Sequence, residues 1–352
     1  MATVPETRTA PHASGHGGVG LPAPRGPLSE ELIEALADER PHDFAGLVDP
    51  PADPLADDDL QLALYLCYEL HYRGLPQVDA GWEWDPGLLG FRASLEGAML
   101  DCLCDAIGGP VAPVDRDAVG RQIFELVEDD DAPSLSGYVE TTATLDEVCE
   151  FVIHRSAYQL KEADPHSWAI PRLSGAAKAA LVEVQADEYG GGDPERVHAT
   201  LFAHTMDALG LDSTYGAYLD RIPGTTLATV NLMSLFGLHR RWRGAIVGHL
   251  AGFEVSSPRP NARYAKGLRR LGFDGPATEF FDEHVEADSV HENIAAYDLA
   301  GGLATAEPEL AGDIVFGVRA LLHCEARFAD QLLSAWEQGL SSLLGAAPAT
   351  GH

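Results

Sequence analysis

Helical periodicity dominates the 352-residue sequence from Leu28 onward, and few stretches alternate with the period of two that strands show. The breaks carry helix signals: three aspartates at 57–59 offer capping carboxylates, and Asp193–Pro194 follows three glycines as an N-cap and a first helical residue. No convincing hairpin is present. The sequence therefore predicts an all-α chain, with helices at 29–39, 58–73, 86–107, 116–128, 134–163, 173–189, 194–210, 225–237, 239–256, 259–271, 275–292 and 307–343.

The chain is expected to have three parts. Residues 1–27 are rich in proline, glycine and small residues, and we expect them to be disordered. Residues 28–130 are predicted to form a helical N-terminal extension. Residues 131–352 are predicted to form the principal helical bundle.

The charge and the cysteines limit the partners and the compartment. With 23 Lys and Arg against 55 Asp and Glu, the formal net charge is −32, so the surface should repel phosphate, and we expect neither nucleic acid nor membrane as a partner. No apolar run is long enough for a transmembrane helix, and the N-terminus does not have a signal-peptide pattern. The five cysteines are odd in number and scattered, which is typical of a reducing cytosol, so the predicted location is cytoplasmic.

The segment FFDEHVEADSVHEN, residues 280–293, carries the first candidate site. His284, Asp288 and His291 are spaced i, i+4 and i+7, so they share one narrow face of a helix. A single histidine on such a face is more often a structural residue than a ligand. The three residues together instead favour metal binding.

A second candidate lies within residues 180–210. Glu188 closes one predicted helix and His198 opens the next, so a turn between antiparallel helices can bring the two side chains together. Glu183 and Asp187 are expected on a solvated acidic face. His204 is expected to be a packing histidine, because it faces away from His198 on the helix.

Two more carboxylates stand where an apolar pattern predicts none. Glu162 taken alone reads as an exposed helix end. Glu254 lies in an apolar helix, where a carboxylate must be paired, neutral or bound to a metal. Oxygen and imidazole ligands without thiolate suit iron or manganese, and seven such groups are too many for one ion. The set matches two metal ions bridged by carboxylates.

These residues resemble the signature of the heme-oxygenase-like di-iron oxidases and oxygenases, also described as iron-containing redox enzymes. That signature has a Glu, then a Glu and a His ten residues apart across a turn, then a Glu, then His-x-x-x-Asp-x-x-His. The resemblance covers roughly residues 134–343 and is most specific in VQADEYGGGDPERVHATLF, residues 184–202. It assigns as catalytic metal ligands Glu162, Glu188, His198, Glu254, His284, Asp288 and His291.

The resemblance implies a heme-oxygenase-like helical bundle for residues 131–352, often dimeric, and a third core helix at 275–292 that orders when iron binds. It implies two Fe(2+) ions per chain, with O2 as co-substrate and reduction of O2 to a peroxide bridging the two ions. The expected substrate is a small metabolite, an amino acid or amine, oxidised by N-oxygenation, desaturation or C–C cleavage, as in natural product biosynthesis. An external electron donor is a further expected partner. Arg240, Arg241 and Arg243 are candidate anchors for a substrate carboxylate, although a basic surface patch explains them equally well.

Two alternatives stay open. One is a non-catalytic iron-binding helical protein. The other is a heme-oxygenase-like or thiaminase-like enzyme of the same fold. Heme oxygenase requires one proximal histidine and thiaminase a cysteine nucleophile, so a set of seven oxygen and nitrogen ligands argues against both.

Overall fold

The computed structural model describes residues 19–38, 42–44, 49–110, 115 and 118–345, with the backbone alone for 287–290. Within these ranges the regular elements are all helices, which confirms the predicted all-α class. No helix among the described residues is both long and apolar enough to cross a membrane.

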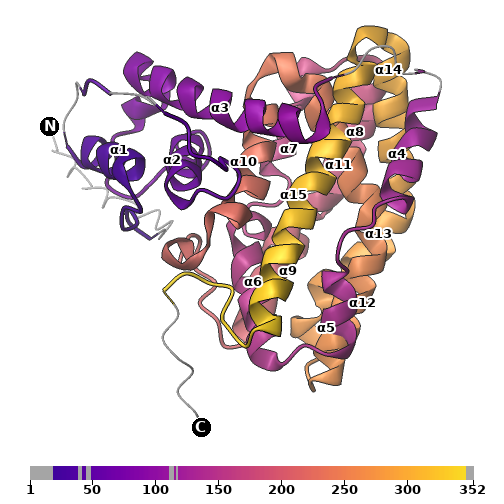
Figure 1. Ribbon diagram of the computed structural model, residues 1–352. Helices are drawn as coiled ribbons and strands as arrows, with labels where there is room; N and C mark the ends of the chain where they lie inside the picture. Colours follow the sequence, from indigo (N-terminus) through magenta and orange to yellow (C-terminus); the bar gives the residue numbers. More distant parts are fainter. Residues whose placement is uncertain (1–18, 39–41, 45–48, 111–114, 116–117, 346–352) are drawn as a thin grey trace, which may run out of the picture.

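An N-terminal layer of helices covers one side of the molecule, on the left and across the top of Figure 1. It consists of α1 (Pro27–Ala37), α2 (Asp58–Glu69), the 3-10 helix η1 (Ala80–Trp84) and α3 (Pro86–Ile107). Residues 60–69 of α2 are all buried, because α1, α3 and the apolar helix α10 (Gly224–Leu238) pack around it. The layer thereby shares one hydrophobic core with the rest of the chain.

The remaining helices form the bundle. Long helix α15 (Ala311–Glu337) runs through the middle of Figure 1, with α11 (Arg243–Ser256) beside it. The other members are α4 (Val119–Glu128), α5 (Leu135–Thr141), α6 (Leu145–Gln159), α7 (Asp164–Ser167), α8 (Gly175–Glu188), α9 (His198–Ala208), α12 (Pro258–Arg270), α13 (Glu279–Asn293) and α14 (Gly302–Ala306). Helix α4 packs on α11 and α15, so contacts typical of the bundle begin before residue 131.

Glycines allow α11 and α15 to approach closely. A Cβ atom added to Gly248 would lie 1.9 Å from the carbonyl oxygen of Ile314, and one added to Gly317 would lie 2.0 Å from that of Ala245. No larger residue fits at either position without moving the backbone of the facing helix. This pair of helices therefore forms a tightly fixed centre, and α11 also carries Glu254.

The predicted helix limits differ from the structure at several ends, and two of the differences bear on the site. The predicted helix 134–163 is two helices, because Thr144 caps α6 through a reciprocal pair of hydrogen bonds with Glu147 and so starts a new helix. Helix α6 ends at Gln159, which places Glu162 in the turn that follows it. The predicted helix 275–292 begins later, at Glu279, and continues beyond Asn293 as a π-helix, Ile294–Gly301. Buried small residues of this π-helix pack on α4, α8 and α11.

The predicted disordered tail extended to residue 27, whereas residues 19–27 lie against the bundle. The backbone N–H of Ala23 donates to Asp220 Oδ1 (2.8 Å), and Arg25 Nη2 donates to the carbonyl oxygen of Leu219 (2.5 Å). Part of the predicted tail is thus held on the bundle by hydrogen bonds. The rest of the predicted tail, residues 1–18, lies outside the described residues.

Candidate metal centre

Six of the seven predicted ligands meet inside the bundle. They come from the turn after α6, from α8, α9 and α11, and from two positions on α13. One group of buried side chains consists of Glu162, Glu188, His198 and His284, and a second of Glu188, Glu254 and His291. Within each group the potential ligand atoms lie within 4.8 Å of one another, and Glu188 belongs to both. The side chain of Asp288, the seventh predicted ligand, lies outside the described residues.

The glycine-rich turn between α8 and α9 brings the first pair together. Glu188 is the last residue of α8 and His198 the first residue of α9, and His198 Nδ1 lies 2.9 Å from Glu188 Oε2. Gly190 has a φ of +68°, and a Cβ atom there would lie 2.7 Å from the backbone carbon of Arg196. Both the left-handed conformation and the close approach require glycine at this position.

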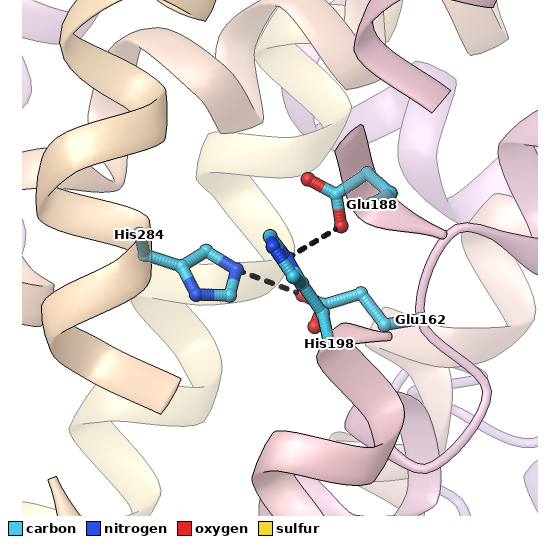
Figure 2. A group of neighbouring side chains, drawn as sticks. All are labelled: Glu162, Glu188, His198 and His284. Carbon is cyan, nitrogen blue, oxygen red and sulfur yellow. Dashed lines mark ion pairs between the residues drawn. The ribbon is translucent and has the colours of Figure 1, made fainter. Parts of the chain in front are cut away.

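His284 completes the first group from the opposite side, as Figure 2 shows. Its Nδ1–H donates to the carbonyl oxygen of Phe280 (2.7 Å), which leaves Nε2 without a proton in the neutral ring. Nε2 faces Glu162 Oε1 at 3.4 Å. A backbone acceptor that fixes one ring nitrogen and directs the other inward is the usual arrangement of a metal-binding histidine.

His291 has the same arrangement with a different acceptor. Its Nε2 lies 2.9 Å from Asp187 Oδ2, and its Nδ1 lies 3.6 Å from Glu254 Oε2. A proton on Nε2 donated to Asp187 leaves the lone pair of Nδ1 directed toward the carboxylate group. Asp187 was predicted to belong to a solvated acidic face. Its side chain is 61% exposed, as expected for such a face. One of its oxygens also orients His291, which the prediction did not include.

Burial and charge oppose each other in this cluster. Burial alone would raise the pKa of Glu188, but His198, His284 and His291 lower it to about 2. Burial disfavours charge on His291 as well, yet Glu254 and Asp187 raise its pKa to about 9. The buried carboxylates of this cluster are therefore stabilised by positive charge on neighbouring imidazoles.

The donor set fits iron. Glu162, Glu188 and Glu254 are 5%, 6% and 4% exposed, so three carboxylates are buried in one place. Glu162 Oε2 is buried and has no hydrogen-bond partner among the described residues. A cavity of about 10 Å³ is lined by these three carboxylates and His284. Carboxylate and imidazole donors around such a space, with no thiolate in either group, suit iron or manganese.

Other residues considered in the sequence lie elsewhere. Glu183 is exposed, and His204 is half-buried and belongs to neither ligand group. The proposed substrate anchors are displaced from the centre, because Arg243 begins α11 whereas Glu254 lies eleven residues along it, about 16 Å at 1.5 Å per residue. Arg243 pairs with Glu307 instead, and Arg240 and Arg241 are exposed. The position of these arginines therefore does not support a role in anchoring substrate at the ligand groups.

Part of the chain is similar to known proteins. A sequence model for a family described as iron-containing redox enzymes matches residues 149–326. A nitrosourea synthase from Streptomyces achromogenes subsp. streptozoticus is 29% identical over 160 residues, which are 45% of this chain and 34% of that protein. The chain thus matches about a third of the length of that relative.

Two crystal structures of a CADD-like protein of unknown function from Nostoc punctiforme share the fold. One has a TM-score of 0.51 at 16% identity and covers 62% of this chain and 97% of its own. The other has a TM-score of 0.50 at 14% identity and covers 67% of this chain and 99% of its own. At these identities the likeness concerns the fold alone.

Proposed function

Because the chain belongs to the iron-containing redox enzyme family, we propose that it is a non-heme di-iron oxygenase or oxidase that acts on a small amine or amino acid. The membership confirms the family resemblance seen in the sequence, and with it the heme-oxygenase-like all-α fold. The family membership by itself supports an iron-containing redox enzyme.

The observation that supports two ions is the sharing of Glu188 between two ligand groups. Glu162, His198 and His284 would hold one ion, and Glu254 and His291 the other, with the Glu188 carboxylate common to both. Asp288, from the same helix as the two histidines, is proposed as the remaining ligand. Bound ferrous iron would supply the electrons for the reduction of O2.

The residues of the chain contribute position and exclusion of water. Phe280 O and the Asp187 carboxylate hold His284 and His291 with one nitrogen directed inward. All six described ligands are at most 6% exposed, so bulk water has little access to the ions. A centre closed to bulk water and arranged in advance would limit side reactions of the oxygen chemistry that bound iron would supply.

An amine or amino-acid substrate is supported by the Streptomyces relative. Its name states that it makes a nitrosourea, a compound with an oxidised nitrogen, and forming such a group requires oxidation at nitrogen. Only 34% of that protein is matched, so the substrate class is our proposal for this chain. The homodimer and the external electron donor stay predictions.

The test is anaerobic loading with ferrous iron, followed by iron analysis and mixing with O2. We expect about two irons per chain, and O2 uptake that a panel of amines and amino acids accelerates. The variant His284→Ala should lose iron and O2 uptake at unchanged helical content. The matched control is His204→Ala, a half-buried histidine outside both groups, which should behave like the wild type.

Two outcomes would contradict the proposal. One iron or fewer per folded chain under saturating ferrous iron rules out the two-ion centre. Two irons without any O2 uptake that depends on a second compound would instead favour the alternative, an iron-binding protein without catalysis.

A further inference from the structure

A buried ion pair joins the N-terminal layer to the residue next to a proposed iron ligand. Lys161 directly precedes Glu162, and its Nζ lies 2.9 Å from Oε2 of Glu69, the last residue of α2. Both side chains are 1% exposed. Residues 28–130 carry no recognisable motif, yet this part of the chain reaches the turn that carries Glu162.

Aromatic side chains enclose the pair. The hydroxyl of Tyr215 donates to the same Glu69 oxygen (2.7 Å), and Lys161 Nζ lies 4.7 Å and 4.5 Å from the ring centres of Tyr65 and Tyr72. Lys161 and Glu69 are thus removed from solvent together, each as the ion-pair partner of the other. Removing either partner would leave the other charge buried without its ion-pair partner.

The turn that carries Glu162 is held from two sides. From the N-terminal layer, Arg73 Nη2 donates to the carbonyl oxygen of Leu160 (2.8 Å), beside the contact of Lys161 with Glu69. From α8, Gln185 Nε2 donates to the carbonyl oxygen of Ala163 (2.8 Å). Ala163 has a φ of +72°, a left-handed conformation that costs free energy in a residue other than glycine. Such a turn keeps its shape only if its surroundings hold it.

We infer that Glu69 is a positioning residue of the iron centre: through Lys161 it fixes the turn that presents Glu162. The N-terminal layer is then a structural part of the metal site rather than a separate extension. This inference rests on the proposed iron centre. It concerns metal binding and not a step of the reaction, because Glu69 contacts Lys161 and Tyr215 and belongs to neither ligand group.

The experiment compares two variants. Each one neutralises the acidic partner of an ion pair made by a basic residue shortly before Glu162, either Lys161 or Arg155. Glu69→Gln removes the charge that holds Lys161. Glu325→Gln is the matched control, because Glu325 forms a two-bond ion pair (2.9 and 2.6 Å) with Arg155, which lies on α6 seven residues before Glu162. The metal-free proteins are titrated anaerobically with ferrous iron alone, and with cobalt(II), whose visible absorption reports the coordination of the ion.

We expect Glu69→Gln to bind iron at least about tenfold more weakly and to change the cobalt spectrum, as is common when a residue that supports a ligand is altered. Glu325→Gln should bind within about twofold of the wild type, even where both variants lose similar thermal stability. Unchanged iron affinity and an unchanged cobalt spectrum in Glu69→Gln would overturn the inference. Failure of the wild type to bind iron would instead defeat the proposed function, so the two failures are distinguishable.

A second variant covers the case in which Glu69→Gln does not fold. Glu69→Met combined with Lys161→Met removes both charges, and apolar replacement of a buried ion pair is often tolerated. The inference predicts a folded protein with weakened iron binding, because the turn has lost its anchor. Wild-type iron affinity in this folded double variant also overturns it.

Discussion

Asp187 shows how one exposed residue can act on a buried one. It lies one position before Glu188 on α8, so it points largely away from the centre, and its side chain is 61% exposed. One carboxylate oxygen nevertheless accepts a hydrogen bond from His291 Nε2. Such a bond fixes the ring orientation and makes the opposite nitrogen a better donor to a metal.

Replacing Asp187 should therefore weaken iron binding without unfolding the protein. We expect Asp187→Ala to reduce ferrous affinity about 10- to 100-fold, the usual effect of losing a carboxylate behind a histidine ligand. Glu183→Ala, one helical turn earlier and also exposed, is the control and should bind iron normally. Equal affinities of the two variants in anaerobic titration would show that the Asp187 contact does not matter.

His154 is a buried histidine outside both ligand groups. Its Nδ1 lies 2.8 Å from Thr226 Oγ1, and its Nε2 lies 3.0 Å from Ser342 Oγ. The Ser342 hydroxyl in turn donates a hydrogen bond to Glu150 Oε2. Burial lowers the pKa of His154 to about 3. The ring therefore stays neutral in the folded protein while it would be protonated in the unfolded chain below pH about 6.5.

This difference predicts a loss of stability in acid. The unfolded state binds the extra proton, so the contribution of His154 is complete above pH about 6.5 and is lost as the pH falls toward 3. Below pH 6 the unfolding free energy of His154→Gln should fall less steeply with decreasing pH than that of the wild type. We expect the two slopes to differ by about 1.4 kcal/mol per pH unit. Urea unfolding of the metal-free proteins measures it, and parallel curves for wild type and variant would contradict the assignment.

At the scale of elements, the turn between α8 and α9 determines whether Glu188 meets His198. Gly190, Gly191 and Gly192 have φ values of +68°, +61° and +91°. Only Gly190 also touches neighbouring backbone, that of Arg196 and Val197, while a Cβ atom on Gly191 would meet nothing within 4 Å. The three glycines therefore differ in whether an added Cβ atom would clash with neighbouring backbone.

Alanine substitution should separate these roles. Gly191→Ala should cost about 1–2 kcal/mol, the price of a left-handed alanine, and retain the iron. Gly190→Ala adds a backbone clash that pushes α8 and α9 apart, so we expect a larger loss of stability and fewer irons per chain. Thermal unfolding and iron analysis of both variants test this, and normal iron content in Gly190→Ala would show that the turn can adapt.

At the scale of the whole molecule, the net charge of −32 acts against compactness. Like charges repel more strongly in the folded protein than in an expanded chain. Raising NaCl from about 10 mM to about 150 mM shortens the Debye length from about 30 Å to about 8 Å, so the Tm of the metal-free protein should rise by several degrees. A Tm that is unchanged or lower at the higher salt would mean that specific ion pairs outweigh the general repulsion.

The N-terminal layer is joined to the bundle by packing and by a buried ion pair. Its helix α2 is enclosed between α1, α3 and α10, and Glu69, the last residue of α2, forms an ion pair with Lys161. Segments about ninety positions apart in the chain thus meet at one ion pair. No local pattern in either segment indicates that partner.

The sequence by itself determined the helical class through local periodicity and capping signals. It determined the family and the candidate ligand types through the resemblance of its Glu, His and Asp pattern to a family signature. His284 and His291 share a face whatever the rest of the chain does, and Glu188 and His198 are joined by a short turn. Only the tertiary structure decided that Glu188 is shared by two groups, that Asp187 supports His291 and that Glu69 reaches Lys161. Each of these contacts joins segments distant in the chain, and the packing of those segments depends on the core as a whole. Arg243 is displaced for a simpler reason: a helix rises about 1.5 Å per residue, so sharing α11 with Glu254 does not place its side chain at the ligand groups.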